Sequence, residues 1–289
     1  MKSNAIDIAN FLKKKLSGKK ISINGISSLD KLKTNSLVFL EKDRINKNFI
    51  NKLNKTKNLL LITNSKNIIL KNYSCIFTKN PRLDYNKIIK HFYEFKIVKK
   101  RIHSSVKIGL NTIIYDNVII KKNVKIGNNV IIYPGTKIEE NTTVHDGCVI
   151  GTNGFAPTQN LKKQLSTMLT SVGGTLIGKN VVIGPLTNID KGTIDNTNIS
   201  NNVYIDSMVM IGHNCKVEKN TVITTGVVLC GSSKIMSNCW IGANSTIKER
   251  VTVKKNNLIG ISSVVLKNTR INGVYAGNPA RYIKNNLKI

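Results

Sequence analysis

The chain has 289 residues, of which 40% are hydrophobic; this excludes a disordered protein and leaves room for one large or two ordinary domains. No stretch approaches the roughly 18 consecutive apolar residues of a membrane helix, and the N-terminus lacks the apolar core of a signal peptide, so we expect a cytoplasmic protein. The formal net charge is +30, yet Lys and Arg are spread along the chain without an aromatic-interleaved basic stripe. A compositional bias of the source genome explains this spread most simply, and the charge is also compatible with acidic ligands such as nucleotides, coenzyme A or an acyl carrier protein.

Residues 1–98 are predicted to form a small α/β domain. The expected elements are a helix from about Ile6 to Leu16, strands within residues 21–28, 36–40 and 58–63, and a helix over residues 80–95. The second helix has a clear start, because Asn80 is a favourable N-cap and Pro81 suits the first helical position.

A strict six-residue repeat of aliphatic residues occupies most of the remaining chain. The repeated positions run from Ile102 to Ile150, from Ile177 to Ile189 and from Ile199 to Ile271. Neither a helix, with its period of 3.6, nor an alternating strand produces a period of six. The pattern is typical of hexapeptide repeats, so we predict a mainly β protein with a left-handed parallel β-helix over residues 99–273 and a C-terminal tail over residues 274–289.

Each repeat is expected to form one face of a triangular coil, with its aliphatic residue pointing to the axis. Residues three repeats apart should therefore stack. Glycine follows the aliphatic residue in many repeats, and we expect it there because a tight turn needs a positive φ. These glycines are Gly109, Gly127, Gly151, Gly178, Gly184, Gly212, Gly242 and Gly260.

The repeat loses its phase twice. The interval between Ile150 and Ile177 is not a multiple of six, and neither is the interval between Ile189 and Ile199. Long excursions from a compact solenoid are often functional, although a harmless surface loop is the alternative.

One histidine, His213, lies in an apolar and small-residue run. A lone histidine in such a setting is more often structural than catalytic, but an imidazole is also suited to take the proton of an attacking amine. Gly231 follows three repeats later, so it should stack on His213, where its backbone N–H could stabilise an oxyanion. The five cysteines show neither CxxC pairs nor zinc spacing, which predicts reduced thiols and no metal site.

Several motifs occur in an order that resembles one family. They are GISSLDKLKTNSLVFL, NPRLDYNKIIKHFY, GTNGFAP, IDKGTIDNT and IGHN. In this order they resemble the UDP-3-O-acylglucosamine N-acyltransferases of lipid A biosynthesis, over nearly the whole chain from about Gly25 to Gly273. The resemblance implies a homotrimer with active sites between subunits, a sugar nucleotide bound partly by the N-terminal domain, His213 as catalytic base and Gly231 in the oxyanion hole.

The resemblance also implies which residues meet the nucleotide-linked amino sugar. These are Phe39, Asn153, Gly154, Phe155, Asp190, Asp195 and Asn214, with residues 153–155 reaching the site from a neighbouring subunit. An acidic residue could orient His213, and the sequence leaves Asp190, Asp195 and Asp206 open for this role.

The chain departs from the family at two places in the site. Lys42 and Ile45 stand where the family generally has an Asn and a Tyr that hold the uracil, and Arg250 stands in place of a second histidine. The ending GVYAGNPARYIK looks more like the coenzyme A-dependent hexapeptide acetyltransferases. That likeness implies a coenzyme A site that includes Ala243, Lys267 and Arg281.

Three functional hypotheses follow. The first is an N-acyltransferase that acetylates a nucleotide-linked amino sugar from acetyl-CoA. The alternative is the lipid A enzyme, which takes a 3-hydroxyacyl chain from acyl carrier protein and needs an apolar groove between subunits that Met208, Met210 or Trp240 could close. The third is a non-catalytic scaffold that could bind nucleic acid, in which His213 is a spectator.

Overall fold

The computed structural model describes residues 3–41, 47–65 and 73–286. Within it the chain divides into two compact units. The first comprises residues 1–96 and 155–170, and the second comprises residues 97–154 and 171–289. No helix of the described residues is long and apolar enough to cross a membrane.

The first unit is an α/β domain built on a five-stranded sheet with the order β2-β7-β6-β5-β4. Its helices are α1 (Ala5–Phe11), α2 (Lys47–Lys55) and α3 (Pro81–Phe92). Its strands are β1 (Ser3–Asn4), β2 (Leu16–Ser17), β3 (Ser22–Ile23), β4 (Gly25–Ile26), β5 (Ser36–Leu40), β6 (Leu59–Thr63), β7 (Tyr73–Phe77), β17 (Pro157–Gln159) and β18 (Leu165–Met168). Helix α2 and strand β7 were not predicted, and α1 is shorter than expected because the chain leaves the helix at Lys13, whose φ is 53°.

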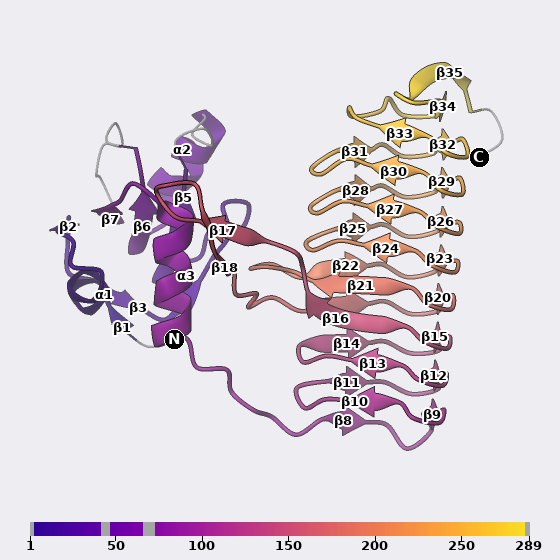
Figure 1. Ribbon diagram of the computed structural model, residues 1–289, viewed down its shortest axis with the longest axis horizontal. Helices are drawn as coiled ribbons and strands as arrows, with labels where there is room; N and C mark the ends of the chain where they lie inside the picture. The colour runs from indigo at the N-terminus through magenta and orange to yellow at the C-terminus, as the bar shows by residue number, and fades with distance from the viewer. Residues whose placement is uncertain (1–2, 42–46, 66–72, 287–289) are drawn as a thin grey trace. The chain divides into compact units, whose positions relative to one another are not determined.

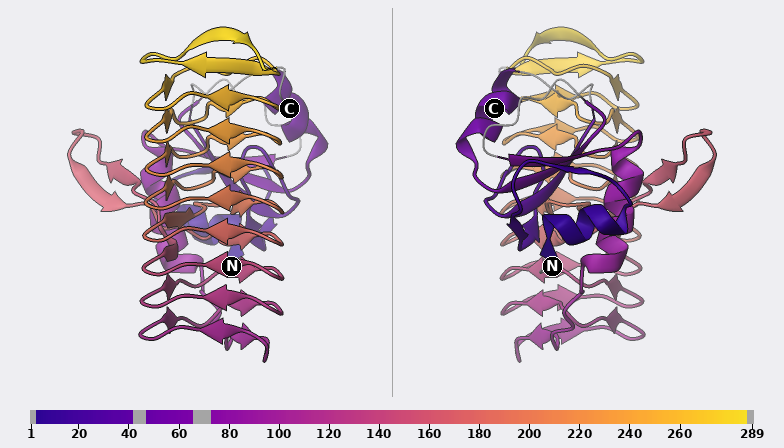
Figure 2. Two further views of the ribbon diagram at one scale, coloured as in Figure 1. Left: turned by 90° about the vertical axis from the view of Figure 1, so that its right-hand side faces the viewer. Right: turned by 90° about the vertical axis from the view of Figure 1, so that its left-hand side faces the viewer.

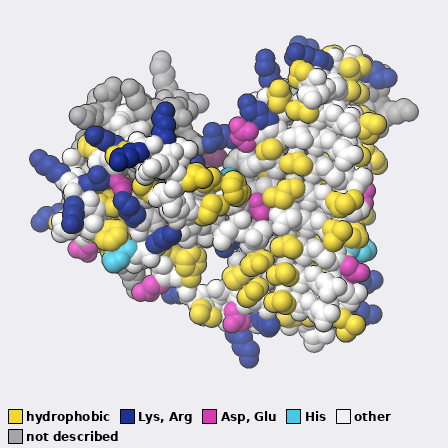
Figure 3. Space-filling view, viewed as in Figure 1, with side chains coloured by type: hydrophobic (Ala, Val, Ile, Leu, Met, Phe, Trp, Pro, Cys, Tyr) yellow, Lys and Arg dark blue, Asp and Glu magenta, His cyan; other side chains and the backbone are white. Residues whose placement is uncertain are grey.

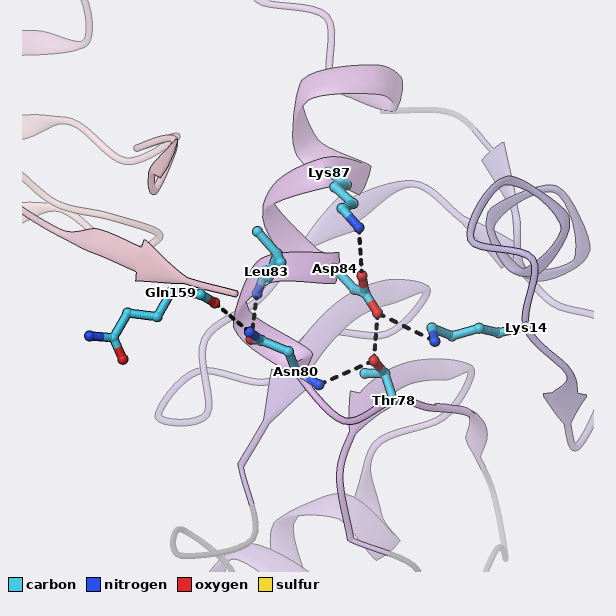
Figure 4. A network of polar contacts seen from close by, with 7 residues as sticks. All are labelled: Lys14, Thr78, Asn80, Leu83, Asp84, Lys87 and Gln159. Atoms are coloured by element: carbon cyan, nitrogen blue, oxygen red, sulfur yellow. Dashed lines mark hydrogen bonds and ion pairs between the residues drawn. The ribbon is translucent and has the colours of Figure 1, made fainter. Parts of the chain in front are cut away.

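Helix α3 starts as the sequence predicts. The side chain of Asn80 accepts a hydrogen bond from the Leu83 N–H at 3.1 Å, and Pro81 is the first helical residue. In the same turn the buried carboxylate of Asp84 accepts a hydrogen bond from the Thr78 hydroxyl and lies 3.4 Å from the Lys87 ammonium (Figure 4). This network gives the start of α3 its polar partners and leaves the rest of the helix to pack on the sheet.

The first phase break of the repeat forms part of this unit. Strands β17 and β18 pair as an antiparallel hairpin. The amide of Asn80 donates to the Gln159 carbonyl at 2.6 Å, and that of Asn86 donates to the Met168 carbonyl at 3.1 Å. The excursion is therefore an ordered addition to the α/β domain, held by the same helix whose start the sequence predicts.

The second unit is a parallel β-helix with three faces, seen edge-on in Figure 1 and from two further sides in Figure 2. The β8 face contains β8 (Arg101–Ile102), β11 (Ile119–Ile120), β14 (Thr136–Ile138), β19 (Thr175–Ile177), β22 (Thr197–Ile199), β25 (Lys216–Val217), β28 (Lys234–Ile235) and β31 (Thr252–Val253). The β9 face contains β9 (Lys107–Ile108), β12 (Lys125–Ile126), β15 (Thr143–Val144), β20 (Val182–Ile183), β23 (Tyr204–Ile205), β26 (Val222–Ile223), β29 (Trp240–Ile241), β32 (Leu258–Ile259), β34 (Gly273–Ala276) and β35 (Arg281–Asn285). The β10 face contains β10 (Ile113–Ile114), β13 (Ile131–Ile132), β16 (Val149–Asn153), β21 (Asn188–Lys191), β24 (Met210–Ile211), β27 (Val228–Leu229), β30 (Thr246–Ile247) and β33 (Val264–Val265).

Most aliphatic residues of the repeat form the core of this unit, as predicted, but in the first coil Ile108 is 45% exposed and Ile102 is only partly buried. On the β10 face the inward positions from Ile132 to Val265 are all buried, at 2% exposure or less. The repeat stops at Ile271, which is 58% exposed and lies outside the core, so the last predicted step is wrong. Strands β34 and β35 continue the β9 face beyond it as an antiparallel pair, so the predicted tail contains regular structure.

The reason why glycine is needed at these repeat positions differs from the one expected. Of those predicted to need a positive φ, Gly151 alone has one, at 85°. The others are required by the next coil: a Cβ on Gly242 would lie 2.7 Å from the Gly260 carbonyl carbon, and one on Gly184 would lie 2.6 Å from the Asp206 carbonyl carbon. Close approach between coils, rather than turn conformation, excludes side chains at these positions.

The left-handed turn positions are instead filled mostly by asparagine, which tolerates this conformation better than other residues. Examples are Asn238 and Asn256, each with a φ of 59°, and Asn272 with a φ of 57°. Their amides form ladders between coils, as in the 3.1 Å hydrogen bond from Asn238 to Asn256. The abundance of asparagine therefore has a structural role in the coil.

Replacing Gly242 by Ala is expected to destabilise the β-helix by about 1–3 kcal/mol, because the new methyl group overlaps the backbone of the next coil. Thermal unfolding followed by circular dichroism measures this. Asn244→Gly in the same turn is the matched control, because Asn244 has a φ of 56° that glycine adopts freely. An unchanged unfolding midpoint for Gly242→Ala would contradict the close-packing explanation.

Candidate active site

The candidate site lies at one corner of the β-helix, where the chain passes from the β10 face to the β8 face. We call it the His213 corner, and its turns comprise residues 153–154, 192–196, 212–214, 230–232, 248–250 and 266–268. Both phase breaks of the repeat occur at this corner, one after β16 and the other after β21. The extra residues are thus concentrated in the coils next to His213.

The imidazole of His213 occupies a slot between two glycines. A Cβ on Gly231 would lie 2.7 Å from Nε2, and a Cβ on Gly154 would lie 2.8 Å from the ring carbon Cδ2. Neither glycine has a positive φ, so the backbone conformation does not require them. Their lack of a side chain is what leaves room for the half-buried ring.

The stacking of coils supports a specific role for Gly231. The same position in the next two coils is occupied by Glu249 and Lys267, so this corner accepts large side chains where no histidine lies below. Gly231 is held over the ring by a 2.8 Å hydrogen bond from the Ser232 N–H to the His213 carbonyl. The predicted stacking of His213 and Gly231 is therefore present, and the glycine keeps Nε2 accessible.

The backbone N–H of Gly231 is a hydrogen-bond donor that the ladder between coils does not use. Its carbonyl accepts a hydrogen bond from the Arg250 N–H at 3.2 Å, which continues the ladder between coils. Its N–H has no acceptor among the described residues. A backbone N–H beside a histidine is the kind of group that binds a developing oxyanion.

The Nδ1 side of the imidazole faces a polar network. Nδ1 lies 3.0 Å from Asn214 Oδ1 and 3.4 Å from the Thr193 hydroxyl. Thr193 belongs to the second phase break, and the sequence analysis did not single it out. Its position inside the motif IDKGTIDNT was the available signal.

Of the three acidic residues left open by the sequence, the structure brings Asp190 to His213. Asp190 is 4% exposed, and burial raises the pKa of its carboxyl, although the Asn188 amide, which donates at 3.0 Å, and the charge of His213 lower it. Asp195 presents its backbone carbonyl to the Asn214 amide at 2.9 Å. Asp206 lies at the corner after the β9 face and accepts a hydrogen bond from the Ser207 N–H.

The other predicted residues are distributed over the molecule. In this chain Gly154 contacts His213 directly, whereas the resemblance had implied a neighbouring subunit as its source. Lys267 lies in the column above His213, while Ala243 and Arg281 lie at the corner after the β9 face, where Arg281 pairs with Ala276.

Phe39 and Phe155 belong to the first unit. The ring of Phe39 lies 4.7 Å from that of Tyr85, and Phe155 is 83% exposed. Lys42 and Ile45, which depart from the family at the expected uracil site, lie outside the described residues. Of the residues proposed to close an acyl groove, Met208 and Trp240 are exposed, and Met210 contacts Asn188.

An open groove of about 640 Å³ lies elsewhere on the β-helix, at the corner that follows the β8 face. Its charged side chains include Glu139 and Glu218, and it contains none of the predicted site residues. The described residues include no cluster of three or more His, Cys, Asp or Glu side chains that could hold a metal ion.

Comparison with known proteins defines the class first. Residues 123–153 match the family described as bacterial transferase hexapeptide (six repeats). LpxA from Acinetobacter baumannii has a similar structure, with a TM-score of 0.58 and 25% identity over 66% of this chain and 73% of that one. A UDP-N-acetylglucosamine acyltransferase gives a TM-score of 0.52 with 25% identity, over 63% of this chain and 70% of that one. The chain thus has the fold and repeat of the hexapeptide acyltransferases.

Curated proteins with similar sequences point to a narrower group of acyltransferases. The UDP-3-O-acylglucosamine N-acyltransferase of Delftia acidovorans is 33% identical over 135 residues, which are 46% of this chain and 39% of that protein. The enzyme of the same name from Hahella chejuensis is 35% identical over 136 residues, which are 47% of this chain and 38% of that protein. The match thus spans less than two fifths of the length of these relatives. It confirms the resemblance to UDP-3-O-acylglucosamine N-acyltransferases that the sequence motifs indicated.

Replacing Asp190 by Asn is expected to stabilise the fold at neutral pH. Burial raises the pKa of Asp190 above its value in the unfolded chain, so its ionised form costs stability at pH 7. The gain should shrink as the pH falls toward the ordinary Asp range, because the carboxyl is then protonated in both states. Thermal unfolding at pH 7 and near pH 4 measures the difference, and a variant less stable than the parent at pH 7 would contradict it.

Proposed function

We propose that this chain is an N-acyltransferase that transfers an acyl group to the amino group of a UDP-linked 3-O-acylglucosamine. The observation that carries the proposal is the slot between Gly154 and Gly231, which holds the His213 ring and leaves Nε2 open. The curated relatives with matching segments are named for this reaction. A scaffold protein would need neither glycine opposite the ring.

The proposed reaction follows from these groups. The sugar amine attacks the thioester carbonyl of the donor, and a C–N bond forms while His213 Nε2 takes the amine proton. The C–S bond then breaks, and the thiolate leaves with the proton that the imidazolium returns. The Gly231 N–H would stabilise the oxyanion of the tetrahedral intermediate, and Asp190 would favour the transient imidazolium charge.

The donor is proposed to be an acyl carrier protein. The comparisons favour this alternative over acetylation from acetyl-CoA, which the C-terminal motif had put first. Both donors carry a phosphopantetheine arm, so both need a cationic path leading to His213. The corner above it supports such a path, because Lys248, Arg250 and Lys267 are exposed there within three coils, about 14 Å at the spacing of paired strands, against the one acidic side chain of Glu249.

The outer surface of the β-helix supports the proposed homotrimer. Outward positions of the β9 face carry a row of exposed or half-buried apolar side chains, and Figure 3 shows hydrophobic patches over this unit. The row comprises Val182, Tyr204, Val222, Trp240, Leu258 and Val274. The β8 face instead presents lysines such as Lys216 and Lys234.

Purified protein should acylate a UDP-linked 3-O-acylglucosamine from a 3-hydroxyacyl carrier protein, and His213→Ala should lower kcat/KM by about 10²–10⁴-fold. Thiol release and mass spectrometry of the sugar product measure the reaction. Acetyl-CoA is the competing donor in a parallel assay. Turnover with acetyl-CoA alone would establish the acetyltransferase hypothesis, and an active His213→Ala variant would contradict the assigned base.

Gly231→Ala should lower kcat/KM by at least about 100-fold, because its methyl group would lie 2.7 Å from Nε2 and displace the ring or block the attacking amine. The variant should fold, since Gly231 has no positive φ and larger residues occupy this position in later coils. Glu249→Ala, in the next coil of the same column, is the matched control. Full activity in Gly231→Ala would overturn the slot as the basis of catalysis.

A further inference from the structure

We propose that Asn214 is a positioning residue that selects the tautomer of His213 and ties it to the turn of residues 192–196. The effect on rate rests on the proposed function, but the tautomer itself does not. The side-chain amide of Asn214 meets a donor on one side and an acceptor on the other. Its Oδ1 accepts from the Thr193 N–H at 3.0 Å, and its Nδ2 donates to the Asp195 carbonyl at 2.9 Å.

These two contacts determine the orientation of the amide. A flipped amide would place its NH₂ against the Thr193 N–H and its oxygen against the Asp195 carbonyl, which are two unfavourable pairs. The atom that lies 3.0 Å from His213 Nδ1 is therefore the oxygen. An amide oxygen only accepts hydrogen bonds, so this contact is a hydrogen bond only when Nδ1 carries the proton, and the Thr193 hydroxyl, farther away at 3.4 Å, can accept from the same N–H.

The proton on Nδ1 determines the state of the opposite ring nitrogen, Nε2. A neutral imidazole has one N–H, so a proton on Nδ1 leaves the lone pair on Nε2. Nε2 is the nitrogen opposite Gly231, where the slot is open. In water the Nε2–H tautomer of histidine is the commoner one, so the site must impose the less common form, and Asn214 supplies the acceptor that does so.

Asn214 also holds the turn that departs from the six-residue repeat. Its backbone N–H donates to the Thr197 hydroxyl at 2.8 Å, so contacts from one residue reach Thr193, Asp195 and Thr197. The turn is thereby anchored at both ends to the residue beside the base. This explains physically why the motifs IDKGTIDNT and IGHN occur together: one supplies the partners that orient the amide of the other.

An ordinary turn role accounts for only part of this arrangement. Asn214 has a φ of 62°, like the asparagines of other coils. The asparagines at the corner after the β8 face bond to asparagines of adjacent coils, as Asn180 does to Asn202 at 3.1 Å. In the coil above Asn214 the same position holds Ser232, so no asparagine is there to pair with. The side-chain amide of Asn214 contacts His213 and the inserted turn instead. Ser232 and Arg250 adopt the same conformation in the next two coils, with φ of 64° and 61°, so it is the contacts that require the amide.

Nitrogen-15 NMR of protein labelled selectively at histidine tests the proposal. The chain has four histidines, so the His213 signals are assigned by their loss in His213→Ala. At alkaline pH we expect a pyrrole-type shift for Nδ1 and a pyridine-type shift for Nε2. Asn214→Gly keeps the turn conformation and removes the amide, and it should shift the population toward Nε2–H. Asn214→Asp keeps an acceptor beside Nδ1 and should retain the parent tautomer.

The control is Asn244→Gly, which removes a left-handed asparagine from another corner and should leave the His213 spectrum unchanged. An Nε2–H tautomer in the parent protein, or an unchanged tautomer in Asn214→Gly, would overturn the proposal. Activity separates it from the proposed function. If that function holds, Asn214→Gly should lower kcat at least tenfold, with partial rescue in Asn214→Asp. A confirmed tautomer without acyl transfer would refute the function and leave the positioning role intact.

Discussion

The stacking of β-helix coils at the spacing of paired strands is the constraint on which the rest of this structure depends. Hydrogen-bonded strands lie about 4.8 Å apart, so corresponding positions of successive coils are always in contact. On the inside this contact aligns aliphatic residues such as Ile211 and Leu229 into a continuous core. On the corners it decides which residues can carry a side chain at all.

The candidate site uses the same contact for a chemical purpose. Any residue at the position of Gly231 lies against the side chain that occupies the corresponding position in the coil below. When that side chain is the imidazole of His213, only a glycine leaves Nε2 reachable, and its N–H then lies next to the base. The proposed base and the proposed oxyanion donor thus come from adjacent coils without any special loop between them.

The irregular parts of the coil supply what the regular parts lack. The six-residue repeat fills the corner after the β8 face with asparagine ladders, which are the same from coil to coil. The end of β21 carries Asp190, whose carboxyl senses the charge of His213, the inserted turn after it brings Thr193 to the ring, and Gly154 at the start of the first excursion lies on the other side. Burial of the Asp190 carboxyl disfavours its charge, which is the kind of local cost often found at functional sites.

The sequence by itself determined the β-helix, the identity of its core residues and the pairing of His213 with Gly231, because a period of six fixes which residues stack as long as it is unbroken. It did not place Asp190 and Asp195 relative to His213, since the inserted residues between Ile189 and Ile199 break the count. The tertiary structure also decided that close approach between coils, rather than turn conformation, requires most of the repeat glycines. The tautomer of the base depends on the amide orientation of Asn214, and that is set by contacts across the inserted turn, which no local pattern contains.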